Sequence, residues 1–283
     1  MTDPDLSGRV CVVTGASRGI GTVTARRLAE MGATVAMVGR DPAASQQALD
    51  DVRKRSGRDD VTLHLADFAS LAEVRRLATE LLDAHPQIHV LVNNAGLWLN
   101  SRQMSADGYE KTLAVNHLAP FLLTNLLLDR LKASAPARIV NVASTAHRGG
   151  RLNFDDLQLE KSYGGTAAYA RTKLANVLFT RELARRIEGT NVTATVCHPG
   201  SVRTDLGRDP GMSRFFYIAG LPFMISPERG ARTQVWLASS PDVEGKSGGY
   251  YSRCHEWSPA SAARDDAAAA LLWSVSEELV GPG

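Results

Sequence analysis

Residues 10–21 read Val10-Cys-Val-Val-Thr-Gly-Ala-Ser-Arg-Gly-Ile-Gly21 and decide the fold of this 283-residue chain. The first five form an apolar, largely β-branched run, typical of a strand buried on both faces of a parallel sheet. Three glycines follow, at Gly15, Gly19 and Gly21. They permit a tight turn and a close approach of phosphate to the backbone, and a helix beginning near Ile20 would offer that phosphate free N–H groups. The stretch predicts a dinucleotide-binding turn; the alternative is a plain glycine turn between a strand and a helix.

Strand and helix patterns alternate along the rest of the chain. Apolar runs that predict further buried strands lie at Thr34–Val38, Val61–Leu65, Ile88–Asn93, Arg138–Ala143 and Val192–Cys197. Helical patterns lie at Ile20–Met31, from Pro42, from Ser70 to Pro86, and at Tyr109–Leu131, Thr166–Ile187 and Ala260–Leu279. This alternation predicts an α/β fold: a single domain over residues 1–283, with a doubly wound Rossmann-type parallel sheet and helices on both faces.

Composition and charge exclude several classes of protein. Apolar residues make up 44% of the chain, and 32 basic against 30 acidic side chains leave a net charge of +2. This balance is untypical of a disordered chain and gives no electrostatic footprint for nucleic acid. The three cysteines lie far apart in sequence, so neither a disulfide framework nor a metal site is expected. No signal peptide and no apolar run of about 18 residues is found, and we expect a cytoplasmic protein without a membrane span.

The end of the second predicted strand bears on the choice of coenzyme. An acidic residue there accepts a hydrogen bond from the ribose 2′-hydroxyl of NAD, whereas an arginine suits the 2′-phosphate of NADP. This strand ends at Arg40, and Ser17 and Arg18 lie in the glycine turn. Arg18 and Arg40 can clamp a phosphate from two sides. Asp41 follows at once, and we interpret it as the N-cap of the next helix. NADP(H) is therefore favoured over NAD(H).

Polar or small residues follow two further strands at the same edge of the sheet. Asp67 and Phe68 come after the third strand, at the edge where the adenine of a bound dinucleotide is expected to lie. Asn94, Ala95 and Gly96 come after the fourth, where a small-residue turn suits the floor of a coenzyme site. Taken singly, each of these features is more often ordinary turn chemistry.

Tyr169 and Lys173 are four residues apart on one predicted helix, and hence on one face of it. Tyrosine normally titrates near pH 10 and is a poor acid or base at neutral pH. A neighbouring cation favours the phenolate, so we expect Lys173, with the positive nicotinamide, to lower the pKa of Tyr169 by about two or three units. The alternative is an incidental pair on an amphipathic helix.

Two more polar residues complete a candidate catalytic set. Ser144 ends the fifth predicted strand at the carboxyl edge of the sheet, where it can hold a substrate oxygen against Tyr169. Asn116 lies inside an otherwise apolar helix, where a polar side chain is disfavoured unless it is exposed or hydrogen-bonded. It can bond a backbone carbonyl and a water that leads to Lys173. A simple satisfied helix asparagine is the alternative.

The ordered set of motifs resembles the short-chain dehydrogenase/reductase family over almost the whole chain. In chain order the motifs are Thr14-Gly-x-x-x-Gly-x-Gly21, Asn93-Asn-Ala-Gly96, Asn116, Ser144, Tyr169-x-x-x-Lys173 and Pro199-Gly200. The resemblance implies a sheet of about seven strands and a hydride passed between a nicotinamide and a carbonyl or alcohol carbon. It implies that Tyr169 is the acid/base, Lys173 the ribose ligand and pKa shifter, and Ser144 the holder of the substrate oxygen, with Asn116 as relay. It also implies that Pro199, Gly200, Val202 and Thr204 lie beside the nicotinamide.

Within this family the chain is similar to the retinol dehydrogenase branch, through Ser144-Thr-Ala-His147, Phe154-Asp-Asp-Leu157, Ser226-Pro-Glu-Arg-Gly-Ala231 and Leu272-Trp-Ser-Val-Ser276. An apolar stretch at 215–225, inside a predicted substrate loop at 201–226, suggests a lipophilic carbonyl or alcohol; a lid, core or subunit-contact role is equally open. The leading hypothesis is an NADP-dependent alcohol dehydrogenase or carbonyl reductase. The alternatives are an enone reductase and a non-catalytic NADP(H) sensor. The family resemblance also implies pairing into a homodimer or homotetramer.

Overall fold

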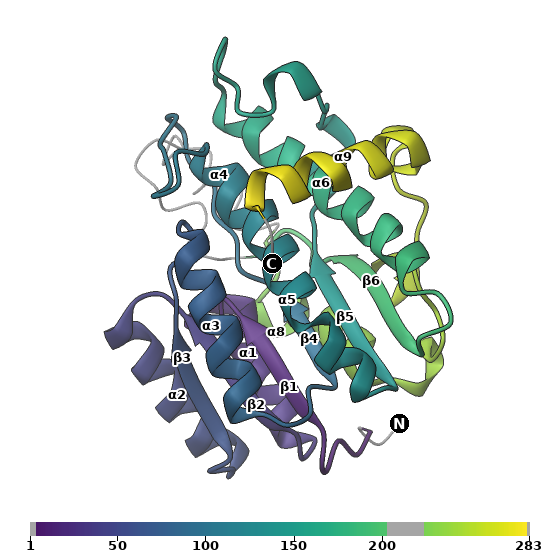
Figure 1. Cartoon of the computed structure of the whole chain (residues 1–283). Helices are drawn as coiled ribbons and strands as arrows, with labels where there is room; N and C mark the ends of the chain where they lie inside the picture. The colour runs from purple at the N-terminus through teal and green to yellow at the C-terminus, as the bar shows by residue number, and fades with distance from the viewer. Residues whose placement is uncertain (1–3, 203–223, 282–283) are drawn as a thin grey trace.

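A computed structural model describes residues 4–202 and 224–281 of the chain. Over these residues, strands lie at β1 Val10–Thr14, β2 Thr34–Gly39, β3 Val61–Leu65, β4 Val90–Asn93, β5 Ala137–Val142, β6 Val192–His198, β7 Tyr250–Ser252 and β8 His255–Glu256. They form one sheet in the order β3-β2-β1-β4-β5-β6-β7-β8, parallel except for the β7–β8 pair (Figure 1). The predicted α/β fold is confirmed. The sheet has eight strands rather than about seven, because a two-residue antiparallel strand extends one edge.

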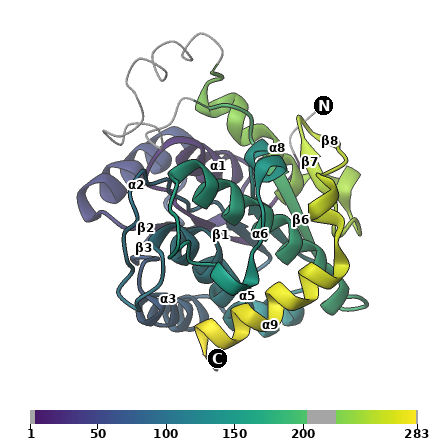
Figure 2. The same ribbon diagram turned by 90° about the horizontal axis from the view of Figure 1, so that it is seen from above.

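Helices cover both faces of the sheet. Their bounds are α1 Gly19–Glu30, α2 Pro42–Ser56, α3 Leu71–Ala84, α4 Lys111–Leu113, α5 Ala119–Ala133, α6 Gly165–Arg186, α8 Pro227–Ser239 and α9 Asp266–Val280. One apolar layer joins the sheet to α3, α5, α6 and α9, and the other joins it to α1, α2 and α8 (Figures 1 and 2). Neighbouring residues of β1 alternate between the layers: Val12 belongs to the first, Cys11 and Val13 to the second. This alternation explains why the strand is apolar throughout.

Helix starts follow the local signals in the sequence. Asp41 accepts a hydrogen bond from the Ala44 backbone N–H at 2.7 Å and so caps α2, as its interpretation as an N-cap requires. Ser70 accepts from the Glu73 backbone N–H at 3.3 Å and caps α3. These two signals are short-range, so neighbouring residues suffice to set them.

The predicted helix Tyr109–Leu131 is interrupted. It begins only at Lys111, and a π turn at Ala114–Leu118 separates α4 from α5. The buried Asn116 lies in that turn. Its amide donates to the Leu97 carbonyl and accepts from the Leu97 N–H, at 2.8 and 2.7 Å. This pairing with a distant segment replaces a uniform α-helix with a wider turn.

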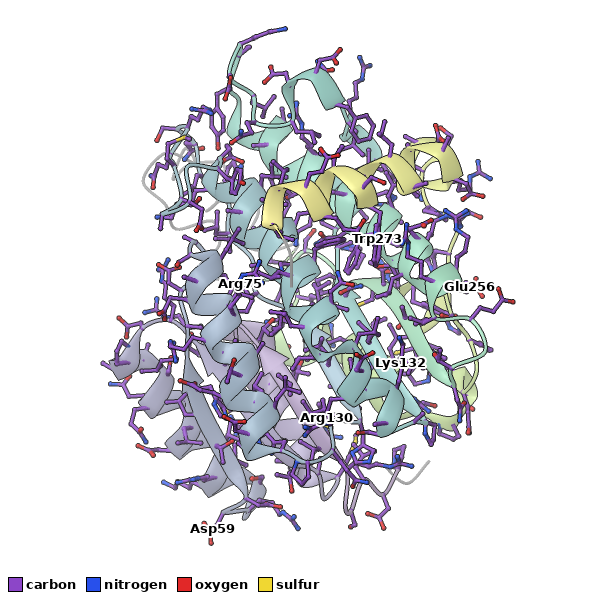
Figure 3. The ribbon with its side chains drawn as sticks, viewed as in Figure 1. Asp59, Arg75, Arg130, Lys132, Glu256 and Trp273 are labelled. Atoms are coloured by element: carbon purple, nitrogen blue, oxygen red, sulfur yellow. The ribbon has the colours of Figure 1, made fainter. Side chains whose placement is uncertain are left out.

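The last helix, α9, lies across α5 and α6 (Figure 1). Trp273 points from α9 into this contact (Figure 3). Its ring centroid is 5.0 Å from that of Phe121 in α5 and 5.8 Å from that of Phe179 in α6. Arg75 of α3 donates to the Val280 carbonyl at 2.6 Å and ties down the end of the helix. Thus α9 covers apolar side chains of both α5 and α6.

Two expectations fall partly or wholly outside the described residues. Thr204 lies outside them, as does most of the predicted 201–226 substrate loop with its apolar stretch at 215–225. Over the described part of the chain, each helix is too short or too polar to cross a bilayer.

Candidate active site

A cleft of about 950 Å³ opens at the carboxyl ends of the parallel strands. This is where ligands bind in open α/β sheets. The predicted residues that line it are Gly15, Ser17, Arg18, Gly19, Ile20, Arg40, Asp67, Phe68, Asn94, Ala95, Gly96, Ser144, Tyr169, Lys173, Pro199, Gly200 and Val202. The structure therefore brings residues from seven separate segments into one site. Gly21 and Asn116 lie behind the wall of the cleft rather than on it.

The glycine turn is built for close backbone contact. Gly15 has a φ of +65°, and a Cβ there would lie 2.7 Å from the Ala95 Cα. A Cβ on Gly21 would lie 2.2 Å from the Gly15 carbonyl oxygen. Gly21 therefore allows the first turn of α1 to pack against the glycine turn, while Gly15 allows β1 to meet the turn after β4. Both turns are held at the edge of the cleft.

Three charged side chains, those of Arg18, Arg40 and Asp41, border the cleft at its expected ribose end. Arg18 and Arg40 are both exposed and both line the cleft. Asp41 also borders it, but its carboxylate is hydrogen-bonded to the first turn of α2. The cationic groups therefore face the cleft while the neighbouring anion is engaged by the helix.

Asp67 and Asn94 support turns as well as lining the cleft. Asp67 accepts from the Ala69 N–H at 3.0 Å. Asn94 donates to the Thr14 carbonyl at 2.8 Å, and its own N–H donates to the Thr14 hydroxyl at 3.0 Å. Asn94 thus joins the end of β4 to the end of β1.

Tyr169 and Lys173 share one face of α6, as their spacing predicts. The Lys173 Nζ lies 5.4 Å from the centre of the Tyr169 ring. Lys173 is buried and donates to the Val142 carbonyl at 3.0 Å, next to the end of β5. A Cβ on Gly96 would lie 3.3 Å from the Asn116 Oδ1 and 3.5 Å from the Lys173 Nζ. Gly96 therefore marks the point where α6 and the π turn converge.

The expected effect of Lys173 on the pKa of Tyr169 is wrong for the chain on its own. Burial raises the pKa of Tyr169 to about 12, against a smaller lowering by a hydrogen bond with Ser144. Burial also lowers the pKa of Lys173 to about 8. Both charged forms lose hydration in the site, and this loss is the largest cause of each pKa shift.

Ser144 and Asn116 are fixed by hydrogen bonds to the backbone. The Ser144 hydroxyl accepts from the Ala146 N–H at 3.2 Å, at the start of a short 3₁₀ turn, Thr145–Gly149. Asn116 makes the expected bond to a backbone carbonyl, that of Leu97, and also donates to the Thr172 hydroxyl at 3.1 Å. Thr172 precedes Lys173, so Asn116 contacts the catalytic face of α6 through a neighbour.

Several residues of the cleft were missed in the sequence. Leu97, Trp98 and Leu99 form an apolar stretch of wall directly after the Asn-Asn-Ala-Gly turn. Their position just beyond the carboxyl end of a buried strand could have indicated that they line the cleft. His198, whose pKa burial lowers to about 4, accepts from the Thr145 N–H at 3.3 Å. Lys111 also borders the cleft, and nothing in its local sequence indicated this.

Comparison with known proteins places this fold and site in one class. The sequence profile of the short chain dehydrogenase family matches residues 9–211. The chain belongs to this family and is an oxidoreductase acting on CH–OH groups.

Among curated proteins, the chain is 44% identical to human retinol dehydrogenase 14 over 99% of its length and 88% of the relative's. It is 43% identical to human retinol dehydrogenase 12, over 99% and 89% of the two chains. A solved structure of an uncharacterized Mycobacterium paratuberculosis protein superposes with a TM-score of 0.81 at 34% identity, covering 98% of this chain and 95% of that one. The Pseudomonas aeruginosa RhlG/NADP active-site complex superposes with a TM-score of 0.71 at 29% identity, over 88% and 96%.

Proposed function

We propose that this chain is an NADP(H)-dependent oxidoreductase that interconverts an alcohol and the corresponding carbonyl of a lipophilic small molecule. The proposal rests on one observation: the candidate catalytic residues and the candidate coenzyme-binding residues line the same cleft. Tyr169, Lys173 and Ser144 lie in the same cleft as the glycine turn and the two arginines, Arg18 and Arg40. A coenzyme spanning that cleft reaches both sets of residues.

The residues at the glycine turn fit a phosphorylated dinucleotide. Gly15 leaves no room for a side chain at the turn, and α1 begins directly after it. Arg40 and Arg18 supply positive charge for a 2′-phosphate, while the Asp41 carboxylate is occupied by the N–H of Ala44. The RhlG structure, a relative of this chain, is an NADP complex. When bound, the nicotinamide coenzyme supplies or accepts the hydride.

The chain's own residues handle the oxygen and its proton. Ser144 and Tyr169 hydrogen-bond the substrate oxygen, and Tyr169 donates a proton during carbonyl reduction or accepts one during alcohol oxidation. Lys173 stabilises the phenolate when it is charged. Asn116 keeps the π turn and α6 in register, because it bonds both Leu97 and Thr172.

The apolar stretch of wall supports a lipophilic substrate. Leu97, Trp98 and Leu99 offer aliphatic and aromatic surface to the cleft. The relatives named above are retinol dehydrogenases. We extend the class of substrate, an apolar alcohol or aldehyde, to this chain rather than retinol itself.

Coenzyme titration followed by a substrate screen tests the proposal. Fluorescence titration is expected to show tighter binding of NADPH than of NADH. Apolar alcohols and aldehydes should then be turned over with the tighter coenzyme, and short polar ones poorly. Enones belong in the same screen, because turnover of enones alone would contradict the assigned reaction.

Tyr169→Phe is the matched test of the acid/base. It removes one hydroxyl, and turnover is expected to fall by roughly a hundredfold or more because no group remains to transfer the proton. The NADPH dissociation constant should stay close to that of the wild type. Retained turnover in this variant would remove Tyr169 from the mechanism.

A further inference from the structure

The C-terminal part of the chain contacts the backbone that carries Ser144. His147 is fully buried, and its Nδ1 lies 2.7 Å from the Ser144 carbonyl oxygen. Its Nε2 accepts a hydrogen bond from the Ala260 backbone N–H at 3.1 Å. Because a backbone N–H can only donate, Nε2 is unprotonated, and the neutral ring carries its proton on Nδ1. His147 therefore donates to Ser144 and is held in place by Ala260.

A second buried histidine lies beside Asn116 and contacts the C-terminal region by a hydrogen bond. His117, the next residue in the π turn, is buried, and its Nε2 lies 2.8 Å from the Ser276 Oγ in α9. The Ser276 hydroxyl gives its proton to the Leu272 carbonyl at 2.7 Å. His117 Nε2 therefore donates to Ser276. The ring also packs against Phe121 and Phe179, with centroid distances of 6.1 Å to each.

Each histidine thus joins a catalytic segment to the C-terminal region by a contact made over a long sequence separation. The His147–Ala260 and His117–Ser276 pairs are 113 and 159 residues apart in sequence. Ala260 and Ser276 both lie beyond residues 9–211, which the family profile matches. In both contacts the C-terminal partner therefore lies outside the segment that the family profile matches.

We infer that the C-terminal region positions Ser144 and Asn116 through two buried neutral histidines, His147 and His117. This inference rests on the proposed function. Both histidines are positioning residues, because each acts through a neighbour and neither lines the cleft. The His147 ring has one orientation because it is hydrogen-bonded on two sides, to the Ser144 carbonyl and to the Ala260 N–H. The His117 ring is held by a hydrogen bond to Ser276 and by packing against Phe121 and Phe179, and so it fixes the π turn against α9.

Single-atom and single-ring changes test the inference in the full chain. Ser276→Ala removes the acceptor for His117, and His147→Asn keeps a donor near Ser144 but no longer reaches Ala260. Ser274→Ala is the control for the first, because Ser274 lies on the exposed side of α9 and bonds only the Ala270 carbonyl among the described contacts. His89→Asn is the control for the second. His89 is also buried and bonds the Val10 backbone N–H at 3.0 Å, but it precedes β4, at the opposite end of the sheet from the cleft.

The readout is kcat per coenzyme-binding site, together with the NADPH dissociation constant and the melting temperature. Ser276→Ala and His147→Asn are expected to lower kcat per site by roughly tenfold, because small displacements of reacting groups are costly, and to leave the NADPH dissociation constant near its wild-type value. Ser274→Ala and His89→Asn should keep kcat per site, even where His89→Asn melts earlier.

An unchanged kcat per site in both test variants would overturn the inference. If the melting temperature of those variants also fell, the two histidines would be assigned to packing alone. A wild-type chain that turns over no alcohol or carbonyl would count against the proposed function instead. An active wild type with unaffected variants counts against the positioning role alone.

Discussion

Arg40 and Asp41 are adjacent at the end of β2 and carry opposite charges, yet the structure gives them different partners. Asp41 caps α2 through the Ala44 N–H, whereas Arg40 borders the cleft. A capping carboxylate is stabilised by the free N–H groups of the helix start, which hold one of its oxygens at the helix rather than at the ribose. Arg40 is therefore the side chain expected to contact the 2′-phosphate of the coenzyme ribose.

Arg40→Asp should reverse the coenzyme preference. Losing a charge-assisted contact with the 2′-phosphate and adding a negative charge is expected to weaken NADPH binding by roughly tenfold or more. NADH binding should strengthen or stay unchanged. Fluorescence titration of both coenzymes measures the ratio, and an unaltered ratio would mean that another group reads the ribose.

Gly21→Ala is expected to disturb the coenzyme site by displacing the glycine turn, although Gly21 itself does not line the cleft. The new Cβ would lie 2.2 Å from the Gly15 carbonyl oxygen, which is backbone and cannot rotate away. Overpacking of this kind typically costs about 1–3 kcal/mol, and here it also shifts the glycine turn. NADPH titration and urea unfolding should both show the loss. Gly149→Ala is the control, since a Cβ there meets nothing within 4 Å; equal effects in the two variants would contradict the steric explanation.

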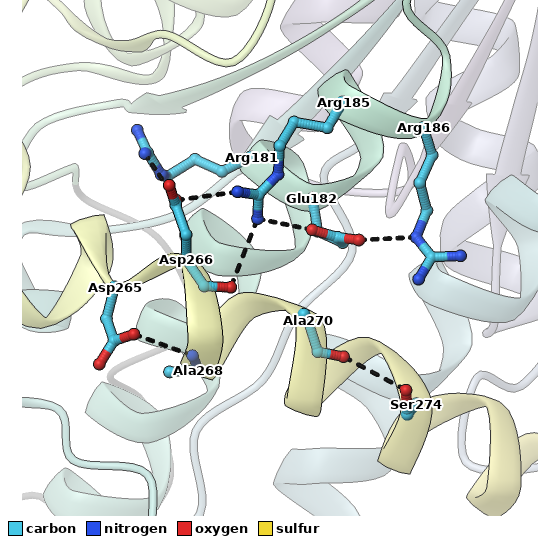
Figure 4. Close-up of polar contacts among 9 residues, drawn as sticks. All are labelled: Arg181, Glu182, Arg185, Arg186, Asp265, Asp266, Ala268, Ala270 and Ser274. Carbon is cyan, nitrogen blue, oxygen red and sulfur yellow. Dashed lines mark hydrogen bonds and ion pairs between the residues drawn. The ribbon is translucent and has the colours of Figure 1, made fainter.

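The contact of α9 with α6 combines an apolar anchor with ion pairs. Arg181 and Arg185 of α6 contact Asp266 of α9 at 3.0 and 3.2 Å, while Glu182 pairs with Arg185 and Arg186 within α6 (Figure 4). The arginine side chains are partly exposed and Asp266 is exposed, and ion pairs that water reaches contribute little to stability. The Trp273 ring, by contrast, is buried between α5 and α6, with the Arg186 guanidinium 4.2 Å from its centre. Apolar burial is therefore expected to hold this helix.

Trp273→Ala should destabilise the protein far more than Asp266→Asn. Removing a buried tryptophan typically costs about 3–5 kcal/mol, because the cavity is only partly refilled. Asp266→Asn removes the charge but leaves the buried rings in place, and a small fraction of that loss is expected. Urea unfolding of both variants decides the matter, and comparable losses would assign the docking of α9 to its charges.

Buried histidines make the whole molecule sensitive to acid. Burial lowers the pKa of His117 and of His198 to about 4 each, from the ordinary value of 6.5. Between those pH values the unfolded chain takes up protons that the folded chain does not. Stability is therefore unaffected by these groups above about pH 6.5 and falls as the pH drops towards 4.

His117→Gln should flatten part of this dependence. A shift of about 2.5 units corresponds to roughly 3 kcal/mol, most of it lost by about pH 4.5. The fall in unfolding free energy between about pH 7 and pH 4.5 is expected to be smaller in the variant by roughly that amount. Urea unfolding at the two pH values gives the comparison. An identical fall in both proteins would show that His117 is not the responsible group.

Sequence patterns sufficed for features that depend on near neighbours. The strand at Val10–Thr14 is recognisable from five residues, and the cap at Asp41 depends on a backbone group three residues away. The pairing of Tyr169 with Lys173 on one face follows from helix periodicity alone. Strand–helix alternation then brings the carboxyl ends of the strands, and the residues that follow them, to one edge.

Features that depend on burial and on distant contacts were decided by the tertiary structure. The sequence places a lysine beside Tyr169 but does not reveal how completely both are dehydrated, and this dehydration raises the pKa of Tyr169 instead of lowering it. The π turn at Asn116 depends on the backbone of Leu97, and the orientations of His117 and His147 depend on groups more than a hundred residues away. Hydrogen-bond periodicity is a property of adjacent residues, whereas desolvation and long-range contacts exist only after the chain has packed.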